Sequence, residues 1–363
     1  MIKESHKQIV LVTGSSGCLG QHIVKLLHEN DDTVQEIRCF DIKPFQNNLQ
    51  FKITKEMQII TADIRNEVQL LKALNGVDVI IHCAALIDVS LFPDESELQS
   101  INVEATQKLI DCAIECNVPY FIHVSGLEAV IGDDNIYYST EHTTIQPTKH
   151  LLGPYARTKF ESDEIVRDAN ERPLANGIDN LLTVILRPTV FYGEQDNNFI
   201  TKVFEVAKWN SNLLRRLDNI YIQMHPVYVG NVAHACLRAK EKMLIERNIG
   251  GEEFFINDDT KFQNPFDFFE PYLKARGFQL SKRSYPYWLF ILIFSFYCCV
   301  IKMIRNFIKI KLPSSLTPAT ITYIVNTYFV NRNKATLRLD YDPLYTNEES
   351  HKRSIEYYRN VPI

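Results

Sequence analysis

The sequence predicts an α/β fold with a doubly wound parallel sheet, followed by a smaller, irregular C-terminal substrate domain and a membrane-anchoring helix. Three observations lead to this prediction: short apolar runs alternate with helical patterns, a glycine-rich turn follows the first run, and a long uncharged stretch lies near residue 300. The length of 363 residues suggests about two domains at roughly 150 residues each.

Composition narrows the class of protein. Hydrophobic residues make up 45% and charged residues 23%, which provides enough apolar surface for a large core and excludes disordered or collagen-like chains. A net charge of −5 argues against nucleic acid as a partner. The eight cysteines are scattered, and Cys112 and Cys116 lack the partners of a metal site, so we expect no metal. A strand beginning near Gln8 leaves no room for a signal peptide, which favours the cytosol.

The expected elements alternate through the first half of the chain and become irregular beyond about residue 190. The expected strands are Ile9–Val12, Ile37–Phe40, Gln58–Ile60, Val77–Ile81, Tyr120–Val124 and Leu182–Leu186. The expected helices are Gln21–Glu29, Val68–Leu74, Val103–Glu115 and Tyr155–Ala169. We therefore expect a dinucleotide-binding domain over 1–190, a substrate-binding region over 191–285, a membrane-anchoring helix over 286–311 and a C-terminal segment over 312–363 that packs back on the substrate region.

A glycine-rich turn joins the first expected strand to the first expected helix. Gly14, Gly17 and Gly20 fit the three needs of a dinucleotide turn: a sharp bend, close approach of the backbone to a pyrophosphate, and tight helix–strand packing. The N–H groups at the start of the helix would face the phosphates. Together with the flanking strand and helix, the turn predicts a Rossmann domain.

Two acidic residues follow later strands at positions suited to the adenosine half of NAD. Asp41 lies 21 residues after Gly20, where a carboxylate accepts hydrogen bonds from the ribose and repels a 2′-phosphate. NAD is therefore favoured, although Arg38 and Lys43 leave NADP as an alternative. Asp63 could bind the adenine or cap the next helix. The small residues after His82 would let the cofactor lie close to the backbone.

Tyr155 and Lys159 are the predicted proton-transfer pair. At i, i+4 on one helix the phenol and the ammonium share a face. We expect Lys159 and the nicotinamide ring to favour the phenolate, and lowering the tyrosine pKa by ~3 units requires roughly 4 kcal/mol. Tyr155 could then take a proton while hydride leaves the same alcohol. Ser125, at the end of the fifth strand, could polarise the substrate oxygen or act only as a turn residue, and Asn102 could hold a water or cap a helix.

These motifs together resemble the extended short-chain dehydrogenase/reductase superfamily and, more narrowly, the 3β-hydroxysteroid dehydrogenase/Δ5–Δ4 isomerase family. The resemblance covers nearly the whole chain. It is carried by the glycine turn, Val79–Val89 with Ile87-Asp88-Val89, the Tyr155/Lys159 pair, Leu186–Glu194 and His225–Ala233.

The resemblance implies NAD-dependent oxidation of a 3β-hydroxyl on a steroid, followed in many members by isomerisation. Tyr155 would be the general base, Lys159 would hold the ribose, and Ser125 would polarise the oxygen. The family usually carries consecutive hydroxyl residues after the fifth strand, the second being catalytic, but here that second residue is Gly126. Either Ser125 shifts, a water or a threonine fills in, or activity is altered. Asp258 and Asp259 lie where the family has its isomerase acidic pair, and they could equally form a solvated turn.

An uncharged run of sixteen residues, 286–301, precedes a basic helical face made by Lys302, Arg305, Asn306 and Lys309. The run is shorter than the ~20 residues of a spanning helix, and the pattern favours a monotopic anchor at a membrane interface over a buried core helix. We expect the endoplasmic reticulum, with a mitochondrial membrane as the alternative.

The expected partners are a steroid or sterol substrate, membrane lipid and, in a homodimer, a second copy of the chain. Two other functions fit the sequence. One is a 4α-carboxysterol 3-dehydrogenase that decarboxylates its product, which the Ile87-Asp88-Val89 and Pro226–Ala233 segments disfavour. The other is a non-catalytic NAD-binding scaffold at a membrane, which Gly126 leaves open.

Overall fold

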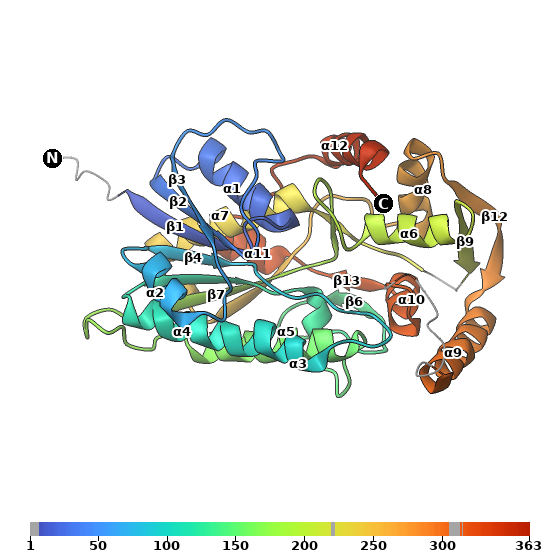
Figure 1. The fold of residues 1–363 in the computed structure, drawn as a ribbon, viewed down its shortest axis with the longest axis horizontal. Helices are drawn as coiled ribbons and strands as arrows, with labels where there is room; N and C mark the ends of the chain where they lie inside the picture. Colours follow the sequence, from blue (N-terminus) through green and yellow to red (C-terminus); the bar gives the residue numbers. More distant parts are fainter. Residues whose placement is uncertain (1–6, 219–221, 305–312, 314) are drawn as a thin grey trace.

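A parallel sheet runs through the centre of the molecule (Figure 1). The computed structural model describes residues 7–218, 222–304, 313 and 315–363. Within them the main sheet has seven strands in the order β3-β2-β1-β4-β5-β7-β11, all parallel. The strands are β1 (Gln8–Thr13), β2 (Val34–Asp41), β3 (Glu56–Thr61), β4 (Val79–His82), β5 (Tyr120–Val124), β7 (Leu182–Pro188) and β11 (Glu252–Ile256). The order in which strands are added reverses at β1, because β2 and β3 lie on one side of it and β4 lies on the other, and open α/β sheets bind their ligands at such a point.

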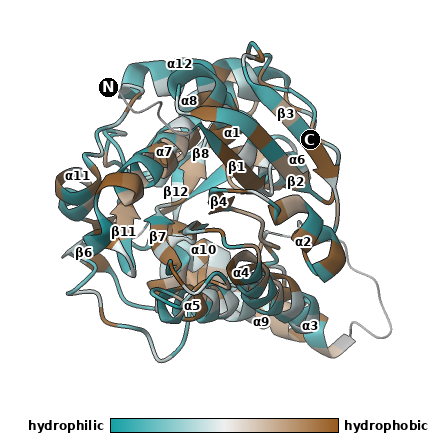
Figure 2. Cartoon of the chain, turned by 90° about the vertical axis from the view of Figure 1, so that its left-hand side faces the viewer, coloured by the Kyte–Doolittle hydropathy of each residue, from teal (hydrophilic) through white to brown (hydrophobic). Residues whose placement is uncertain are grey.

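Helices cover both faces of this sheet (Figure 1). One layer contains α1 (Cys18–Asn30) and α7 (Val229–Ile245), and the other contains α2 (Glu67–Leu74), α4 (Ala105–Glu115) and α5 (Gly153–Asp168). The short helix α3 (Glu95–Leu98) leads through a π-helical turn, η1 (Gln99–Glu104), into α4. In Figure 2 the central β1 and β2 are largely brown while the outer helix α12 (Asn347–Asn360) is largely teal, as expected for an apolar sheet inside a polar shell.

The doubly wound parallel sheet is confirmed, and the six expected strands and four expected helices all form. The prediction missed β11, which pairs with β7 at the sheet edge. This strand begins with two glutamates and lies far along the chain from β7, so its sequence carries little of the apolar run typical of a buried strand. Since α7 and β11 complete the sheet layers, a boundary at residue 190 does not separate the sheet from the substrate region.

Beyond β7 the chain forms short paired strands and helices rather than a second large sheet. The pairs are β8 (Phe191–Tyr192) with β10 (Val227–Tyr228), β9 (Leu213–Asp218) with β12 (Gln279–Pro286), and β6 (Ile136–Ser139) with β13 (Tyr328–Val330). The helices here are α6 (Ile200–Trp209), α8 (Pro265–Ala275), α10 (Pro318–Val325), α11 (Asn333–Leu339) and α12. The last helix packs on α8, and the Tyr358 hydroxyl donates to Asp196 and accepts from the Gly193 N–H, each at 2.9 Å.

Helix α9 (Tyr287–Ile304) projects from the rest of the molecule at the end of β12 (Figure 1). It is not a core helix, because Trp288 is 67% and Phe296 72% exposed. Among the residues that the structure describes, no helix combines the length and apolarity needed to cross a bilayer. Of the predicted basic face only Lys302 is described; Arg305, Asn306 and Lys309 lie outside the described residues.

Candidate active site

The glycine turn lies between β1 and α1, at the point where the order of successive strands changes from one side of β1 to the other. Gly14 has a φ of +67°, and a Cβ there would lie 2.8 Å from the Ala84 backbone after β4. A Cβ on Gly20 would lie 2.1 Å from the Gly14 carbonyl oxygen. Side chains are therefore excluded from both positions, which keeps the turn tight and leaves its surface open to a dinucleotide phosphate.

Asp41 ends β2 next to this turn. Its carboxylate accepts hydrogen bonds from the Ser16 N–H at 3.0 Å and the Lys43 N–H at 2.9 Å. Arg38 is committed elsewhere, since its guanidinium donates to Glu36 and to the Ala73 carbonyl, both at 2.7 Å. The arginine that kept NADP open therefore contacts neighbouring protein groups, whereas the carboxylate that favours NAD lies at the turn.

Asp63 follows β3, but it does not cap the next helix. Asn66 is the N-cap of α2, where its side chain accepts from the Gln69 N–H. The Asp63 carboxylate instead pairs with Arg65 at 2.7 Å, and this hydrogen-bonded ion pair lowers its pKa. The helix-cap role is wrong, because α2 begins at Glu67 and Asn66 takes the cap position, three residues after Asp63. Binding of adenine by Asp63 stays a prediction.

Asn102 lies in the π-helical turn before α4, so it is not a helix cap. Its side-chain amide donates to the Leu86 carbonyl and to the Thr158 hydroxyl, both at 3.0 Å, and its oxygen accepts from the Leu86 N–H at 2.8 Å. These bonds tie the segment after β4 to α5, which carries Tyr155 and Lys159. Asn102 thus positions the two elements that frame the site.

Tyr155 and Lys159 lie one turn apart in the first half of α5, and both are buried. The Lys159 ammonium donates to the Val124 carbonyl at the end of β5, at 3.0 Å, and burial lowers its pKa. Burial also raises the pKa of Tyr155, and the nearby Glu128 carboxylate raises it further. The lowering expected from Lys159 together with the nicotinamide ring stays a prediction, and burial of the phenol acts against it.

Ser125 directly follows the last residue of β5. Its N–H continues the sheet by donating to the Leu186 carbonyl at 2.8 Å. Its hydroxyl is buried and, among the described residues, has no hydrogen-bond partner. A buried hydroxyl without a partner costs about 1–3 kcal/mol, and a substrate oxygen would remove that cost. Ser125 and Tyr155 line the same cavity.

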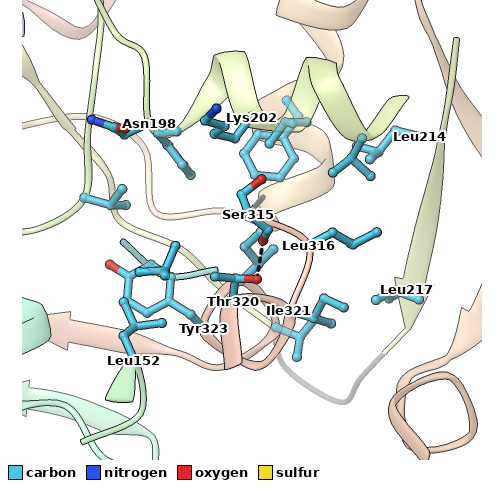
Figure 3. Close-up of a pocket in the computed structure, with 18 of the residues that line it drawn as sticks. Leu152, Asn198, Lys202, Leu214, Leu217, Ser315, Leu316, Thr320, Ile321 and Tyr323 are labelled. Atoms are coloured by element: carbon cyan, nitrogen blue, oxygen red, sulfur yellow. Dashed lines mark hydrogen bonds between the residues drawn. The ribbon is translucent and has the colours of Figure 1, made fainter. Parts of the chain in front are cut away.

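That cavity has a volume of about 580 Å³, which suits a small organic ligand. Its walls are mainly apolar and come from the ends of β5 and β7 and from α6, β9, α9 and α10. In Figure 3, Asn198 and Lys202 lie on the α6 side of the cavity, opposite Thr320 and Tyr323 of α10. An apolar ligand of this size could therefore extend from Tyr155 toward α9.

Asp258 and Asp259 do not line this cavity. Asp258 is buried, where its carboxylate accepts from the Tyr228 and Thr260 N–H groups at 2.9 Å and from the Asn231 amide at 2.7 Å. Asp259 is exposed and pairs with Arg332 at 2.7 Å. A solvated turn therefore does not describe Asp258, which is buried and accepts three hydrogen bonds. For the isomerase role, neither carboxylate lines the cavity that Tyr155 lines.

The polar residues of the cavity that were not predicted from the sequence include Glu128, Thr189 and Tyr323. The Tyr323 hydroxyl donates to Glu128 Oε1 at 3.0 Å across 195 residues of chain. The Thr189 hydroxyl is buried and has no partner among the described residues. Thr189 follows an Arg-Pro pair that the sequence did single out, but no local pattern connects Tyr323 with Glu128.

A family model for the 3-beta hydroxysteroid dehydrogenase/isomerase family matches residues 11–287. The chain belongs to this family. Membership of this enzyme family confirms the prediction that the chain is an enzyme. A mouse relative named 3 beta-hydroxysteroid dehydrogenase type 7 is 29% identical over 356 residues, which is 96% of this chain and 95% of the mouse protein.

A second relative of the chain, from Monkeypox virus, is named 3 beta-hydroxysteroid dehydrogenase/Delta 5-->4-isomerase. It is 33% identical over 351 residues, which is 95% of this chain and 97% of the viral protein. Among solved structures, a UDP-glucuronic acid 4-epimerase from Bacillus cereus in complex with UDP-glucuronic acid and NAD matches with a TM-score of 0.68 and 18% identity. That match covers 97% of this chain and 99% of the epimerase, and it supports the fold.

Proposed function

We propose that this enzyme oxidises the 3β-hydroxyl of a steroid or sterol to a ketone with NAD. The observation that carries the proposal is that Tyr155 and Ser125 both line a mainly apolar cavity of about 580 Å³. A cavity with apolar walls and few polar groups suits a ligand whose polar atoms lie at its ends.

The residues of the sheet edge fit NAD. Gly14 and Gly20 leave room for a pyrophosphate, Asp41 would accept from the adenosine ribose, and Lys159 would hold the nicotinamide ribose. When bound, NAD accepts the hydride from the carbinol carbon. Tyr155 takes the hydroxyl proton, the Lys159 ammonium stabilises the resulting phenolate, and Ser125 donates a hydrogen bond to the substrate oxygen. The positive charge of a bound nicotinamide ring would favour the phenolate form of Tyr155, which burial opposes.

The test is NADH formation by the purified protein in detergent, with a panel of 3β-hydroxysteroids that includes a 4α-carboxysterol. We expect turnover with a 3β-hydroxysteroid lacking the carboxyl group and a loss of about 10³-fold or more in kcat for Tyr155→Phe, with NAD affinity unchanged. Absorbance of the conjugated enone in the same assay reports whether isomerisation follows oxidation. Absence of turnover across the panel would reject the proposal, and turnover of the 4α-carboxysterol alone would favour the decarboxylating alternative.

We also propose that α9 holds the enzyme on the cytosolic face of the endoplasmic reticulum membrane. Its exposed residues include a set of large apolar side chains, namely Trp288, Leu289, Leu292, Ile293, Phe296, Tyr297 and Met303. Exposed Lys282, Arg283 and Lys302 flank this face and would attract anionic lipid headgroups.

Phe296→Lys tests this proposal, with Leu337→Lys as its control, because Leu337 is a 77% exposed leucine on α11. Sedimentation with vesicles of phosphatidylcholine and phosphatidylserine should fall several-fold for Phe296→Lys and stay unchanged for Leu337→Lys. Equal sedimentation of the two variants would contradict the proposal. Fluorescence microscopy of the tagged protein distinguishes the endoplasmic reticulum from a mitochondrial membrane.

A further inference from the structure

Gly126 stands where this enzyme family usually carries its second hydroxyl residue, so the substrate oxygen lacks a donor at that position. The structure shows what fills the space. A Cβ placed on Gly126 would lie 2.2 Å from Glu128 Oε2, well inside contact distance. The carboxyl group of Glu128 thus occupies the volume that a serine side chain at 126 would need.

A backbone turn and a hydrogen bond hold Glu128 in this position. It lies in a single turn of 3₁₀ helix, η2 (Leu127–Val130), which begins directly after Gly126. The Tyr323 hydroxyl donates to Glu128 Oε1 at 3.0 Å. One carboxyl oxygen is therefore fixed by α10, and the other is the oxygen next to Gly126, in the cavity that Ser125 and Tyr155 also line.

Charge decides which form of Glu128 is compatible with catalysis. Burial raises the pKa of Glu128, and its carboxylate raises the pKa of Tyr155. An ionised Glu128 would therefore oppose the phenolate on which the reaction depends. A protonated Glu128 removes that repulsion and has one O–H group to donate.

We propose that Glu128 is a catalytic residue: its carboxylic acid takes the place of the absent hydroxyl at 126 and donates a hydrogen bond to the substrate's 3-oxygen. The inference rests on the proposed oxidation of a 3β-hydroxyl. In that step the carbinol C–H bond breaks and hydride passes to NAD, the O–H proton passes to Tyr155, and the C=O bond forms. Glu128 keeps its own proton throughout, so the step balances without a further reactant.

Ser125 is a second donor to the same oxygen in the proposed function, and Thr189 is a further candidate, because both buried hydroxyls have no partner among the described residues. The variants Glu128→Ala, Glu128→Gln, Ser125→Ala and Thr189→Val separate the contributions of the three residues. Removing one donor to a developing oxyanion costs about 10²–10³-fold in kcat. We expect a loss of about 10²-fold in kcat for Glu128→Ala, with a smaller change in KM. Glu128→Gln should stay within about tenfold of the wild type, because the amide also donates. Ser125→Ala should lose less than Glu128→Ala.

A double variant tests the exchange of donors directly. In Gly126→Ser/Glu128→Ala the serine has room, and we expect its kcat to exceed that of Glu128→Ala by about tenfold. The proposal is overturned if Glu128→Ala stays within threefold of the wild type, or if Glu128→Gln is impaired as strongly as Glu128→Ala. NAD affinity and the far-ultraviolet circular dichroism spectrum of each variant confirm that the fold is intact.

The absorption spectrum of a bound steroid tests the hydrogen bond from Glu128 independently of the proposed oxidation. A 4-en-3-one steroid bound together with NADH should absorb at longer wavelength when a carboxylic acid donates to its carbonyl oxygen. We expect the red shift in the wild type and Glu128→Gln and its loss in Glu128→Ala. If no 3β-hydroxysteroid is oxidised, the proposed function fails, while the red shift and its loss still judge the hydrogen bond. A bound steroid with the same spectrum in wild type and Glu128→Ala would overturn the role of Glu128.

Discussion

The sheet half of the molecule and the part that follows β7 are connected in different ways. In the sheet half, β1, β2 and β3 pair in chain order, and the single helix α1 connects β1 to β2. After β7, distant segments meet: β6 pairs with β13, and the Thr327 N–H donates to Asn135 across 192 residues. The cavity is lined by residues of both parts, including Tyr155 from the sheet half and Tyr323 from the part that follows β7. The glycine turn and Asp41 thus come from elements close together in the chain, whereas the cavity walls come from distant segments.

The strongest way to break the sheet half is to disturb its glycine turn. Gly20→Ala places a Cβ 2.1 Å from the Gly14 carbonyl oxygen, which is backbone and cannot move freely. We expect the free energy of unfolding to fall by about 3 kcal/mol and NAD binding to be lost. Gly17→Ala is the graded control, because its Cβ would lie 3.2 Å from the same oxygen. Urea unfolding and NAD titration check both variants, and equal stability of Gly20→Ala and wild type would contradict the tight packing of the turn.

Acid should weaken the sheet half through its buried histidines. Burial lowers the pKa of His22 and of His123 from 6.5 to about 4. The unfolded chain therefore binds protons that the folded chain refuses, so stability is full above about pH 6.5 and falls as pH drops toward 4. Each histidine should cost about 2 kcal/mol between pH 7.5 and pH 5. Urea unfolding at several pH values measures the slope. In His123→Gln it should become shallower, and an unchanged slope would refute the assignment.

A milder change tests how the C-terminal segment is held. Tyr358→Phe removes the hydroxyl that links α12 to the buried Asp196 and to Gly193, both at 2.9 Å. We expect a loss of about 1–2 kcal/mol in the free energy of unfolding, because a buried acceptor and a buried donor lose a partner. Tyr137→Phe, at a 58% exposed tyrosine, is the control and should change nothing measurable. A loss in the control of equal size would show that the Tyr358 hydroxyl has no special role.

The smallest effect is expected at Asp259, the exposed member of the acidic pair after β11. Asp259 is 63% exposed and pairs with Arg332 at the surface, so Asp259→Asn should change stability by less than about 0.5 kcal/mol. It should also leave the rate of enone formation unchanged, because Asp259 does not line the cavity. Asp258→Asn should cost about 1–3 kcal/mol, since that carboxylate accepts from three buried N–H groups. A selective loss of enone formation in Asp259→Asn would restore the isomerase role.

The two halves also differ in how far the sequence predicts them. The period-2 and period-3.6 patterns of the sheet half arise from local geometry, so strands such as Tyr120–Val124 and the turn at Gly14 were predicted correctly. The contact between Tyr323 and Glu128 depends on packing across most of the chain, and no local pattern reports it. Gly126 was recognised as a departure, but only the structure shows that a neighbouring carboxyl group fills the space that it leaves. No local pattern reports that burial raises the pKa of Tyr155, because burial depends on the whole fold.

The position of the cavity has a kinetic consequence. Ile293 and Tyr297 of α9 line the cavity and are also 61% and 40% exposed at the molecular surface. If α9 rests in lipid, the same side chains touch the bilayer and the substrate, and the steroid reaches Tyr155 without crossing water. The rate would then follow the mole fraction of steroid in the membrane, and adding inert lipid at constant total steroid would slow the enzyme as dilution slows a reaction in solution.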